Sequence, residues 1–274
     1  MTVMAIDWSG AKKPARKIWL AEARSGQIDR LEPLYSRDAA FQEMVTFARG
    51  RSDTIVGLDF AFSLPAWFLR ERCLKSAFDL WPVVEREGER WLSACEPPFW
   101  GRSGTVKPRV ESHYRRTEER LLVGGHRPKS GLQINGGGTV GTGSIRGMPF
   151  LAKARHVGFS VWPFDAPRTP VIVEIYPRAL TGAIVKSSQS ARADYLLDNW
   201  PDLRPSMRDL ATSSDDAFDA AVSALVMDDH RDEFAALEPT DELGRLEGEI
   251  WIPSERPNNA LHPSPAVLSL GGRG

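Results

Sequence analysis

Three short apolar segments, each with an acidic residue at or near its end, constrain the fold of this chain more than any other feature. They are Val3–Ile6 before Asp7, the 53–62 segment around Asp59, and the 169–177 segment around Glu174. Runs of this length that are bounded by Gly, Pro or Ser predict strands buried on both faces of a sheet. An acid at the carboxyl end of such a strand lies where open α/β sheets bind ligands.

The segments between these strands predict the order strand, hairpin, helix, strand for the first sixty residues. Lys17–Ala23 and Ile28–Leu34 flank a Ser-Gly turn and predict a hairpin. Ala39–Arg49 has apolar residues at helical spacing. The later chain predicts four longer helices and one short strand: helices at 77–94, 145–157, 191–200 and 213–230, and a strand at 249–252.

Length and composition narrow the classes of protein that remain. A chain of 274 residues can bury a core as one large domain or two small ones. It has no apolar run long enough to cross a membrane and no secretory signal at its start, so we expect no membrane partner. Its two cysteines, Cys73 and Cys95, are too few for a disulfide framework or a cysteine zinc site. A cytoplasmic location is therefore expected.

The charges are unevenly distributed although their sum is close to zero. The 101–156 segment is strongly basic, whereas the last third of the chain is acidic. This asymmetry indicates a surface for an anionic ligand beside an acidic centre. The alternative is that these charges are solvated faces of helices.

A glycine-rich stretch at 129–147 contains the pattern G-x-G-x-x-G at Gly136, Gly138 and Gly141. The residues before it are polar, so it lacks the buried strand that a dinucleotide-binding fingerprint requires. A loop whose amides approach a phosphate is one interpretation, and plain flexibility is the other.

A further pair of acids lies on the predicted helix 213–230. Asp216 and Asp219 are three residues apart, so they share one face of that helix. Asp216 suits the first helical turn, where the helix dipole favours an acid. Asp219 lies in the second turn, among residues expected to pack, and is therefore the more informative of the two.

These acids predict one metal site if the strands that carry them are neighbours. Carboxylates that converge cannot all stay ionised unless a cation lies among them, and hard oxygen ligands select Mg²⁺ or Mn²⁺. Two such ions about 3.5–4 Å apart can activate a water molecule and stabilise a leaving oxygen in phosphoryl transfer. The five histidines show no metal-binding or catalytic-triad spacing.

Several stretches together resemble a known group of proteins. Ala5–Gly10, Gly57–Ser63 and the predicted hairpin and helix between them look like the ribonuclease H fold. Asp215–Leu225 resembles the last helix of RuvC-type junction resolvases. With Gly143–Pro149 and Glu174–Leu180, the chain is similar to the family known as domain of unknown function 429, which is regarded as a group of RNase H-like nucleases.

The resemblance implies an α/β fold with a central mixed β-sheet of about five strands and helices on both faces. It implies a single domain over 1–253, in which a large helical and loop insertion at 65–164, after the fourth strand, departs from the compact nuclease core. The polar composition of 254–274, rich in Pro, Asn, Ser and Gly, predicts a flexible tail. Asp7, Asp59, Asp216 and Asp219 would be metal ligands, and Glu174 a further catalytic acid. The insertion would supply contacts to phosphate from Arg109, Lys129, Thr142 and Arg146.

Three functions follow from these observations. The first is a Mg²⁺- or Mn²⁺-dependent nuclease that hydrolyses phosphodiester bonds, with nucleic acid or a nucleotide as its partner. The second is a small-nucleotide phosphohydrolase or phosphotransferase of the actin and sugar-kinase type, although we find no second copy of the domain after Glu174. The third is a binding protein without catalysis, in which the acids are helix caps and solvated ends.

Overall fold

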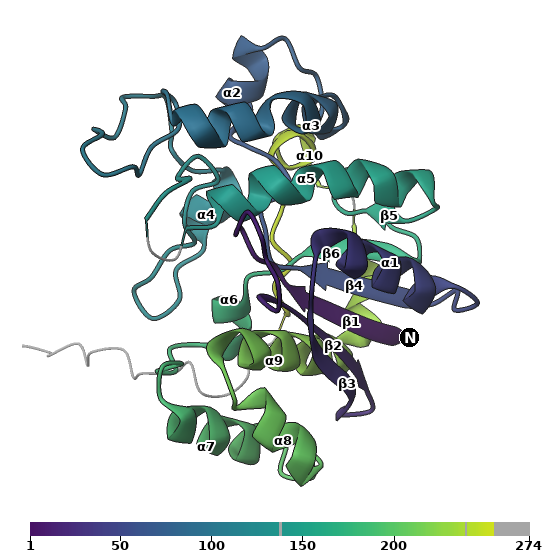
Figure 1. The fold of residues 1–274 in the computed structure, drawn as a ribbon. Helices are drawn as coiled ribbons and strands as arrows, with labels where there is room; N and C mark the ends of the chain where they lie inside the picture. Colours follow the sequence, from purple (N-terminus) through teal and green to yellow (C-terminus); the bar gives the residue numbers. More distant parts are fainter. Residues whose placement is uncertain (137–138, 239, 255–274) are drawn as a thin grey trace, which may run out of the picture.

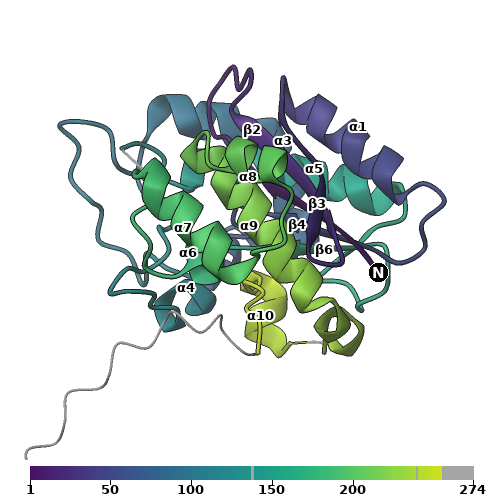
Figure 2. The same ribbon diagram turned by 90° about the horizontal axis from the view of Figure 1, so that it is seen from below.

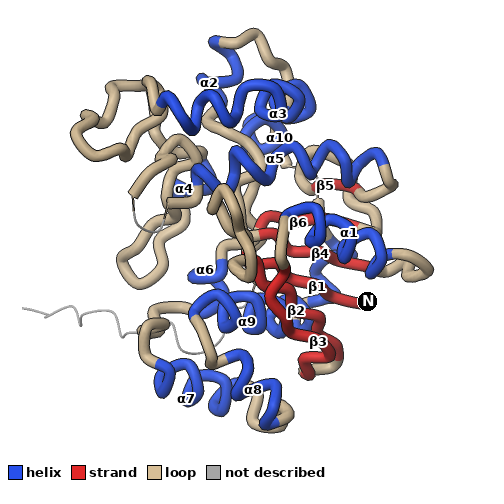
Figure 3. Tube along the Cα trace, viewed as in Figure 1, coloured by secondary structure: helices blue, strands red, loops and turns tan. Residues whose placement is uncertain are grey.

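A mixed β-sheet lies between two sets of helices in the computed structural model, which describes residues 1–136, 139–238 and 240–254 (Figures 1 and 3). The six strands are β1 (Thr2–Asp7), β2 (Ile18–Arg24), β3 (Gln27–Leu34), β4 (Thr54–Leu58), β5 (Ser160–Val161) and β6 (Val171–Glu174). The predicted α/β class and the predicted hairpin are confirmed.

The strand order across the sheet is β3-β2-β1-β4-β6-β5. β1, β4, β6 and β5 run parallel, and β2 is antiparallel to its neighbours β1 and β3. Ile6 pairs with Leu58, and Leu58 pairs with Glu174, so the carboxyl ends of three strands meet at one edge. The sheet has six strands rather than about five, because the two residues of β5, at the end of the predicted insertion, pair with β6.

Three long helices lie on one side of the sheet: α1 (Arg37–Ala48) and α5 (Gly141–His156) cover this face, and α3 (Ala77–Ala94) packs on the outer side of α5. α3 has the predicted bounds, and Ser76 caps its first turn by accepting a hydrogen bond from the Asp79 amide. α5 begins four residues before the predicted start. Both α3 and α5 share one apolar core with β1 and β4, and the 65–164 segment supplies more than half of the buried residues in the core on this face of the sheet.

The opposite face is covered by α9 (Asp215–Asp229), with α7 (Gln189–Asn199) and α8 (Pro205–Ala211) outside it (Figure 2). Ser214 caps α9 by accepting a hydrogen bond from the Ala217 amide. The helix lies so close to the sheet that a side chain at Gly57 of β4 would meet the Met227 sulfur at 2.5 Å. This close approach fixes the height of α9 above the ends of β1 and β4.

Shorter elements complete the described chain. They are α2 (Ala66–Glu71), α4 (Arg116–Arg120), α6 (Pro177–Thr181), a 3₁₀ helix (Arg231–Ala236) and α10 (Glu242–Glu247). The predicted strand at 249–252 is reduced to one bridge between Ile250 and Glu174. Apart from Ser254, the predicted tail lies outside the described residues.

Candidate active site

Asp7 and Asp59 are neighbours at the carboxyl edge of the sheet. Asp7 ends β1 and Asp59 directly follows β4, and the Asp59 amide donates to the Ile6 carbonyl across the pair at 3.1 Å. Side chains alternate between the two faces along a strand. Asp7 and Asp59 have the same parity as Val3 and Ile55, which pack in the core on the α9 side. Both carboxylates therefore belong to the face that α9 covers.

Asp219 approaches this pair from α9. It lies in the second turn of the helix, and its side chain is only 19% exposed. The ammonium of Lys186, from the segment between α6 and α7, lies 2.5 Å from one Asp219 carboxylate oxygen. The edge of the sheet, the second turn of α9 and the 182–188 segment thus bring three acids and one lysine together.

The pKa values of the three acids reflect this crowding. Burial first, and then the charge of Asp219, raise the pKa of Asp59 to about 8, while Lys186 opposes the shift. Burial, then Asp59 and then Asp219 raise the pKa of Asp7 well above its usual range. Burial also raises the pKa of Asp219 against the effect of Lys186. One ammonium is too little positive charge for three carboxylates in a poorly hydrated place.

Asp216 lies at the outer side of the same cluster. It is one helical turn before Asp219 and is exposed. Partial burial and the neighbouring charge of Asp215 raise its pKa. Its own charge raises the pKa values of Asp7, Asp59 and Asp219, so it contributes to the same electrostatic field from the solvent side.

Glu174, the fifth predicted acid, has a different environment. Its parity on β6 matches Ile172, which packs in the core on the α3 and α5 side. Arg115 grips both of its carboxylate oxygens, at 2.5 and 2.9 Å, and the Phe62 amide donates to one of them at 3.0 Å. Glu174 is only 3% exposed. Both oxygens accept hydrogen bonds, so Glu174 joins the end of β6 to Arg115 and to the segment that follows β4.

The Arg115 side chain is the centre of a buried polar network beneath the site. It also pairs with Glu118 at 2.8 Å and donates to the Glu247 carbonyl of α10 at 3.0 Å. The Glu247 carboxylate accepts from the backbone amides of Ala66 and Arg116, both at 2.7 Å. Burial raises the pKa of Glu118 to about 7, although Arg115 opposes the shift. This network joins segments that are far apart in the sequence, at 62–66, 115–118, 174 and 247.

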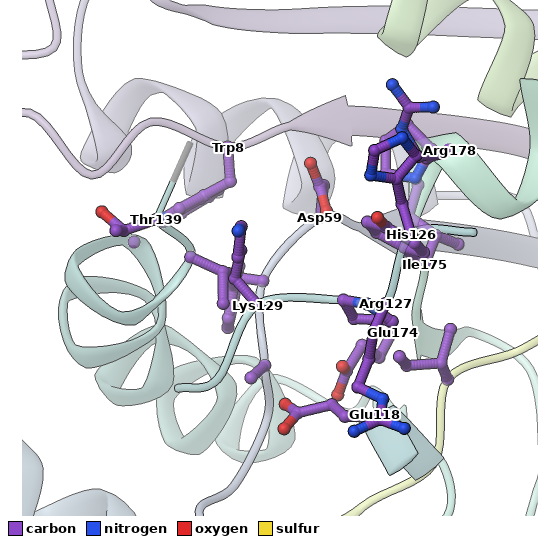
Figure 4. Close-up of a pocket in the computed structure, with 18 of the residues that line it drawn as sticks. Trp8, Asp59, Glu118, His126, Arg127, Lys129, Thr139, Glu174, Ile175 and Arg178 are labelled. Carbon is purple, nitrogen blue, oxygen red and sulfur yellow. The ribbon is translucent and has the colours of Figure 1, made fainter. Parts of the chain in front are cut away.

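A cavity of about 720 Å³ opens beside the acids (Figure 4). Asp59, Asp219 and Lys186 line it together with the Arg115–Glu174–Glu118 network. Other side chains reach it from the 114–129 segment, from α6 and from the turn after β1. Those most relevant to ligand binding are Trp8, Tyr114, His126, Arg127, Lys129, Tyr176 and Arg178.

The four residues predicted to contact phosphate lie in different environments. Lys129 lines the cavity, whereas Arg109 is exposed and lies outside the lining formed by the described residues. The Thr142 hydroxyl donates to the Ile134 carbonyl. Arg146 pairs with Glu89 at 2.6 Å and also donates to a backbone carbonyl in the turn after β1. The side chains of Thr142 and Arg146 therefore already have hydrogen-bond partners within the protein.

Arg146 and Arg37 hold the turn that follows Asp7. Arg146 donates to the Gly10 carbonyl, and Arg37 donates to the Ser9 carbonyl at 2.8 Å. Burial lowers the pKa of Arg37 to about 10, and the charge of Arg146 contributes to the shift. The start of α5 packs on the same turn so closely that a side chain at Gly10 would meet the Gly143 amide at 2.8 Å. The backbone beside Asp7 is thus fixed from two helices.

The glycine-rich stretch supplies this helix start. Gly141 opens α5, and Gly143 faces the turn after β1. The stretch does not follow a buried strand, as expected. Residues 137 and 138 lie outside the described chain, so the predicted phosphate-binding loop is described only in part.

The cavity brings in residues that the sequence did not single out. Lys186, Arg127, Arg178 and the Arg115 network are the main additions. The basic character of the 101–156 segment was a signal for Arg127 and Arg115. For Arg178 the only signal in the sequence was its position four residues after Glu174, at the end of a predicted strand. We find no comparable signal for Lys186.

The arrangement is not a closed metal centre. Across residues 1–136, 139–238 and 240–254, no group of three or more His, Cys, Asp or Glu side chains is arranged so that it could hold a metal ion. Instead, the Lys186 ammonium makes the close contact with Asp219. The donor chemistry of Asp7, Asp59 and Asp219 nevertheless consists of carboxylate oxygens alone, which hard divalent cations prefer.

Comparisons with protein-family models, with curated proteins and with solved structures find no match to this chain. Among the helices that the structure describes, none has both the length and the apolar composition needed to span a membrane.

Proposed function

We propose that this protein is a metal-dependent phosphodiester hydrolase with an RNase H-like fold. The observation that carries the proposal is the convergence of Asp7, Asp59 and Asp219 from two adjacent strand ends and one helix. Burial and mutual repulsion raise the pKa values of all three acids, which is the electrostatic state expected of a cation site.

The sheet topology supports this proposal. An antiparallel hairpin β2-β3 is followed across the sheet by the parallel strands β1 and β4, and Asp7 and Asp59 lie at the carboxyl ends of these two strands. The sequence motifs that resemble RNase H and RuvC-type enzymes fall on β1, β4 and α9, the three elements that carry the cluster.

In this proposal Asp7, Asp59 and Asp219 would hold Mg²⁺ or Mn²⁺, with Asp216 adding negative charge from outside. Such an ion supplies positive charge to the phosphate and to the reacting water. Binding of the metal ion would require the Lys186 ammonium to leave the Asp219 oxygen, because the ammonium and the metal ion would compete for the same carboxylate oxygen. Arg37 and Arg146 would keep the Asp7 backbone in place, and Glu174 would support β6 through Arg115.

The reaction is hydrolysis. The water oxygen bonds to phosphorus, and the phosphorus–oxygen bond to the leaving ester oxygen breaks. One water proton ends on the released hydroxyl, and the other belongs to the new phosphate monoester. The chain's own contribution is to orient the phosphate against the carboxylates and to hold the site rigid.

The test is the conservative replacement Asp7→Asn, assayed with labelled single-stranded and duplex nucleic acids with and without Mn²⁺. Cleavage should fall by about a hundredfold or more, while the melting temperature stays the same or rises because repulsion is relieved. Asp198→Asn, an exposed acid on α7, is the matched control and should cleave like the wild type. Full Mn²⁺-dependent activity in Asp7→Asn would refute the assignment.

The cavity favours a second candidate, a phosphohydrolase for small nucleotides. Its volume of about 720 Å³ lies in the range of small-molecule sites. The salt dependence of binding separates the two functions. A steep fall in affinity with salt would support several contacts to a phosphate polymer, whereas a shallow response would favour a small ligand.

A further inference from the structure

Acidic and basic side chains line the same cavity. Asp59 and Asp219 line it with Lys186, whereas Arg127, Lys129 and Arg178 bring basic side chains from two other segments. Figure 4 draws Lys129 and Arg178 on opposite sides of Asp59. A ligand that contacts the basic side chains would therefore carry its negative charge next to the acids.

The three basic residues differ from the other cations around the site. Arg115, Arg116, Arg146 and Lys186 all form ion pairs with carboxylates. Within the described part of the chain, no ion pair joins Arg127, Lys129 or Arg178 to an acid. Guanidinium and ammonium groups that line a cavity without an acidic partner are suited to an anionic ligand, and phosphate is the anion that Arg binds in two-pronged geometry.

The 123–129 turn, which carries Arg127 and Lys129, forms one side of the cavity. Val123 and His126 form a two-bond bridge with N···O distances of 2.9 Å, and Gly124 and Gly125 turn the chain between them with positive φ angles. Gly124 lies against Ala183, in the segment that leads to Lys186, so closely that a side chain there would clash at 2.8 Å. The 123–129 turn and the segment after α6 thus meet beside the acids.

Aromatic rings lie on the same cavity. Trp8, Tyr114 and Tyr176 line it, and the Arg127 guanidinium lies 5.2 Å from the centre of the Tyr114 ring. Stacking on aromatic side chains is the usual way in which proteins hold unpaired bases, and it accompanies basic grooves that bind phosphates. A base that is paired in a duplex has no free face to offer.

We propose that Arg127, Lys129 and Arg178 form a phosphate-binding wall, and that the cavity takes one unpaired nucleotide instead of a duplex. The proposal rests on the hydrolase function only for the position of the scissile bond, which would lie between this wall and the carboxylates. The unpaired nucleotide can come from a single strand or from a short free oligonucleotide. Its base would lie against the aromatic rings of the cavity.

The test measures binding alone, with the intact chain in EDTA. The probes are a fluorescent single-stranded octamer, the duplex of the same sequence, and a 5′-phosphorylated dinucleotide used as a competitor. The single strand should bind at least about tenfold more tightly than the duplex. With three phosphate contacts, log K should fall against log salt with a slope of about −2.

Single replacements of Arg127, Lys129 or Arg178 by Gln should each weaken single-strand binding about tenfold and reduce the salt slope by about 0.7. Arg49→Gln, an exposed cation at the end of α1 and outside the cavity lining, is the matched control and should bind like the wild type. Circular dichroism melts of each variant establish that the fold is retained. A folded variant with wild-type affinity would remove that residue from the wall.

Duplex binding as tight as single-strand binding would overturn the proposal. If the dinucleotide displaces the labelled octamer at the same concentration as unlabelled octamer does, the result would support the proposal and confine recognition to the cavity. Competition only by the octamer would also support the wall, with further contacts along the strand. Because no turnover is read, failure of the hydrolase proposal leaves this measurement unchanged, and failure here leaves the Asp7→Asn assay unchanged.

Discussion

Replacing Asp59 by Asn should change how the stability of the protein depends on pH. In the folded chain, burial and the charge of Asp219 raise the pKa of Asp59 to about 8, whereas an unfolded chain has an ordinary value near 3.8. The folded state therefore binds the proton more tightly. Its contribution to stability is fully present below pH 4 and is lost progressively as the pH rises through about 8.

The size of the effect follows from this interval. Stability falls by about 1.4 kcal/mol per pH unit wherever the folded state keeps a proton that the unfolded state has lost. Four units would give a limit of about 6 kcal/mol over the whole range. Asp59 keeps a partly exposed edge, and solvent screens its interactions, so we expect about half of that limit, or about 3 kcal/mol. Asn is neutral throughout and should abolish this contribution.

Urea unfolding at pH 5, 6, 7 and 8 in EDTA measures the contribution of Asp59 to the unfolding free energy directly. The difference in unfolding free energy between Asp59→Asn and the wild type should grow in favour of the variant by about 2–3 kcal/mol from pH 5 to pH 8. Glu118 titrates in both proteins, so the subtraction largely cancels its effect. Asp59→Asn also removes the charge that raises the pKa of Asp7, and this change favours the variant at high pH as well. Asp198→Asn, the exposed control, should run parallel to the wild type.

A difference that stays constant from pH 5 to pH 8 would refute the reasoning. It would mean that Asp59 titrates alike in the folded and unfolded chains and does not belong to a crowded carboxylate cluster. A difference that grows in the opposite direction would show that a positive charge, and not burial, dominates at Asp59.

Two further replacements test the cations around the site. Lys186→Met removes the only ammonium that contacts Asp219 among the described residues, so stability should fall by about 1–3 kcal/mol at pH 8 and by less at pH 5; equal losses in melts at the two pH values would contradict this. Arg115→Met leaves Glu174 and Glu118 buried without a counter-charge, and urea unfolding at pH 8 should show a loss of about 3–5 kcal/mol. Because the pKa of Glu118 is already about 7, part of that loss should be recovered at pH 6, and a loss that increases at pH 6 would contradict the account.

Much of the fold could be predicted from local sequence patterns. Buried strands have a simple signal, so β1, β4 and β6 were found from their apolar runs, and the hairpin and α3 followed from turn residues and helical spacing. The signal fails where an element is held by its neighbours. β5 has two residues and exists only because β6 provides its partner, and the predicted strand at 249–252 pairs through Ile250 alone.

The site was predictable where strand ends and helix turns determine direction. Asp7, Asp59 and Asp219 meet because two parallel strands end in register beneath one helix. Glu174 also ends a strand, but it lies one position out of phase, so its side chain belongs to the other face of the sheet. Counting alternate residues along 171–174 against Val171 and Val173 could have shown this, once the face of α9 was known.

The cations required the three-dimensional structure. Arg146 and Arg127 have the same charge and come from the same basic segment, yet one forms ion pairs within the fold and the other lines the cavity. Nothing local distinguishes them, because the difference depends on Glu89, which is more than fifty residues away along the chain. Lys186 likewise meets Asp219 only through the packing of α6 against α9.

The Arg115 network also has a consequence for protein synthesis. Its last partner, Glu247, binds the backbone of residues 66 and 116, which leave the ribosome long before it does. Until Glu247 emerges, a nascent chain contains Arg115, Glu118 and Glu174 but lacks the hydrogen bonds that Glu247 accepts from residues 66, 115 and 116. The floor of the cavity is therefore completed only after α10 has been synthesised, and a truncated product that stops before α10 would contain every cluster acid and still lack a finished pocket.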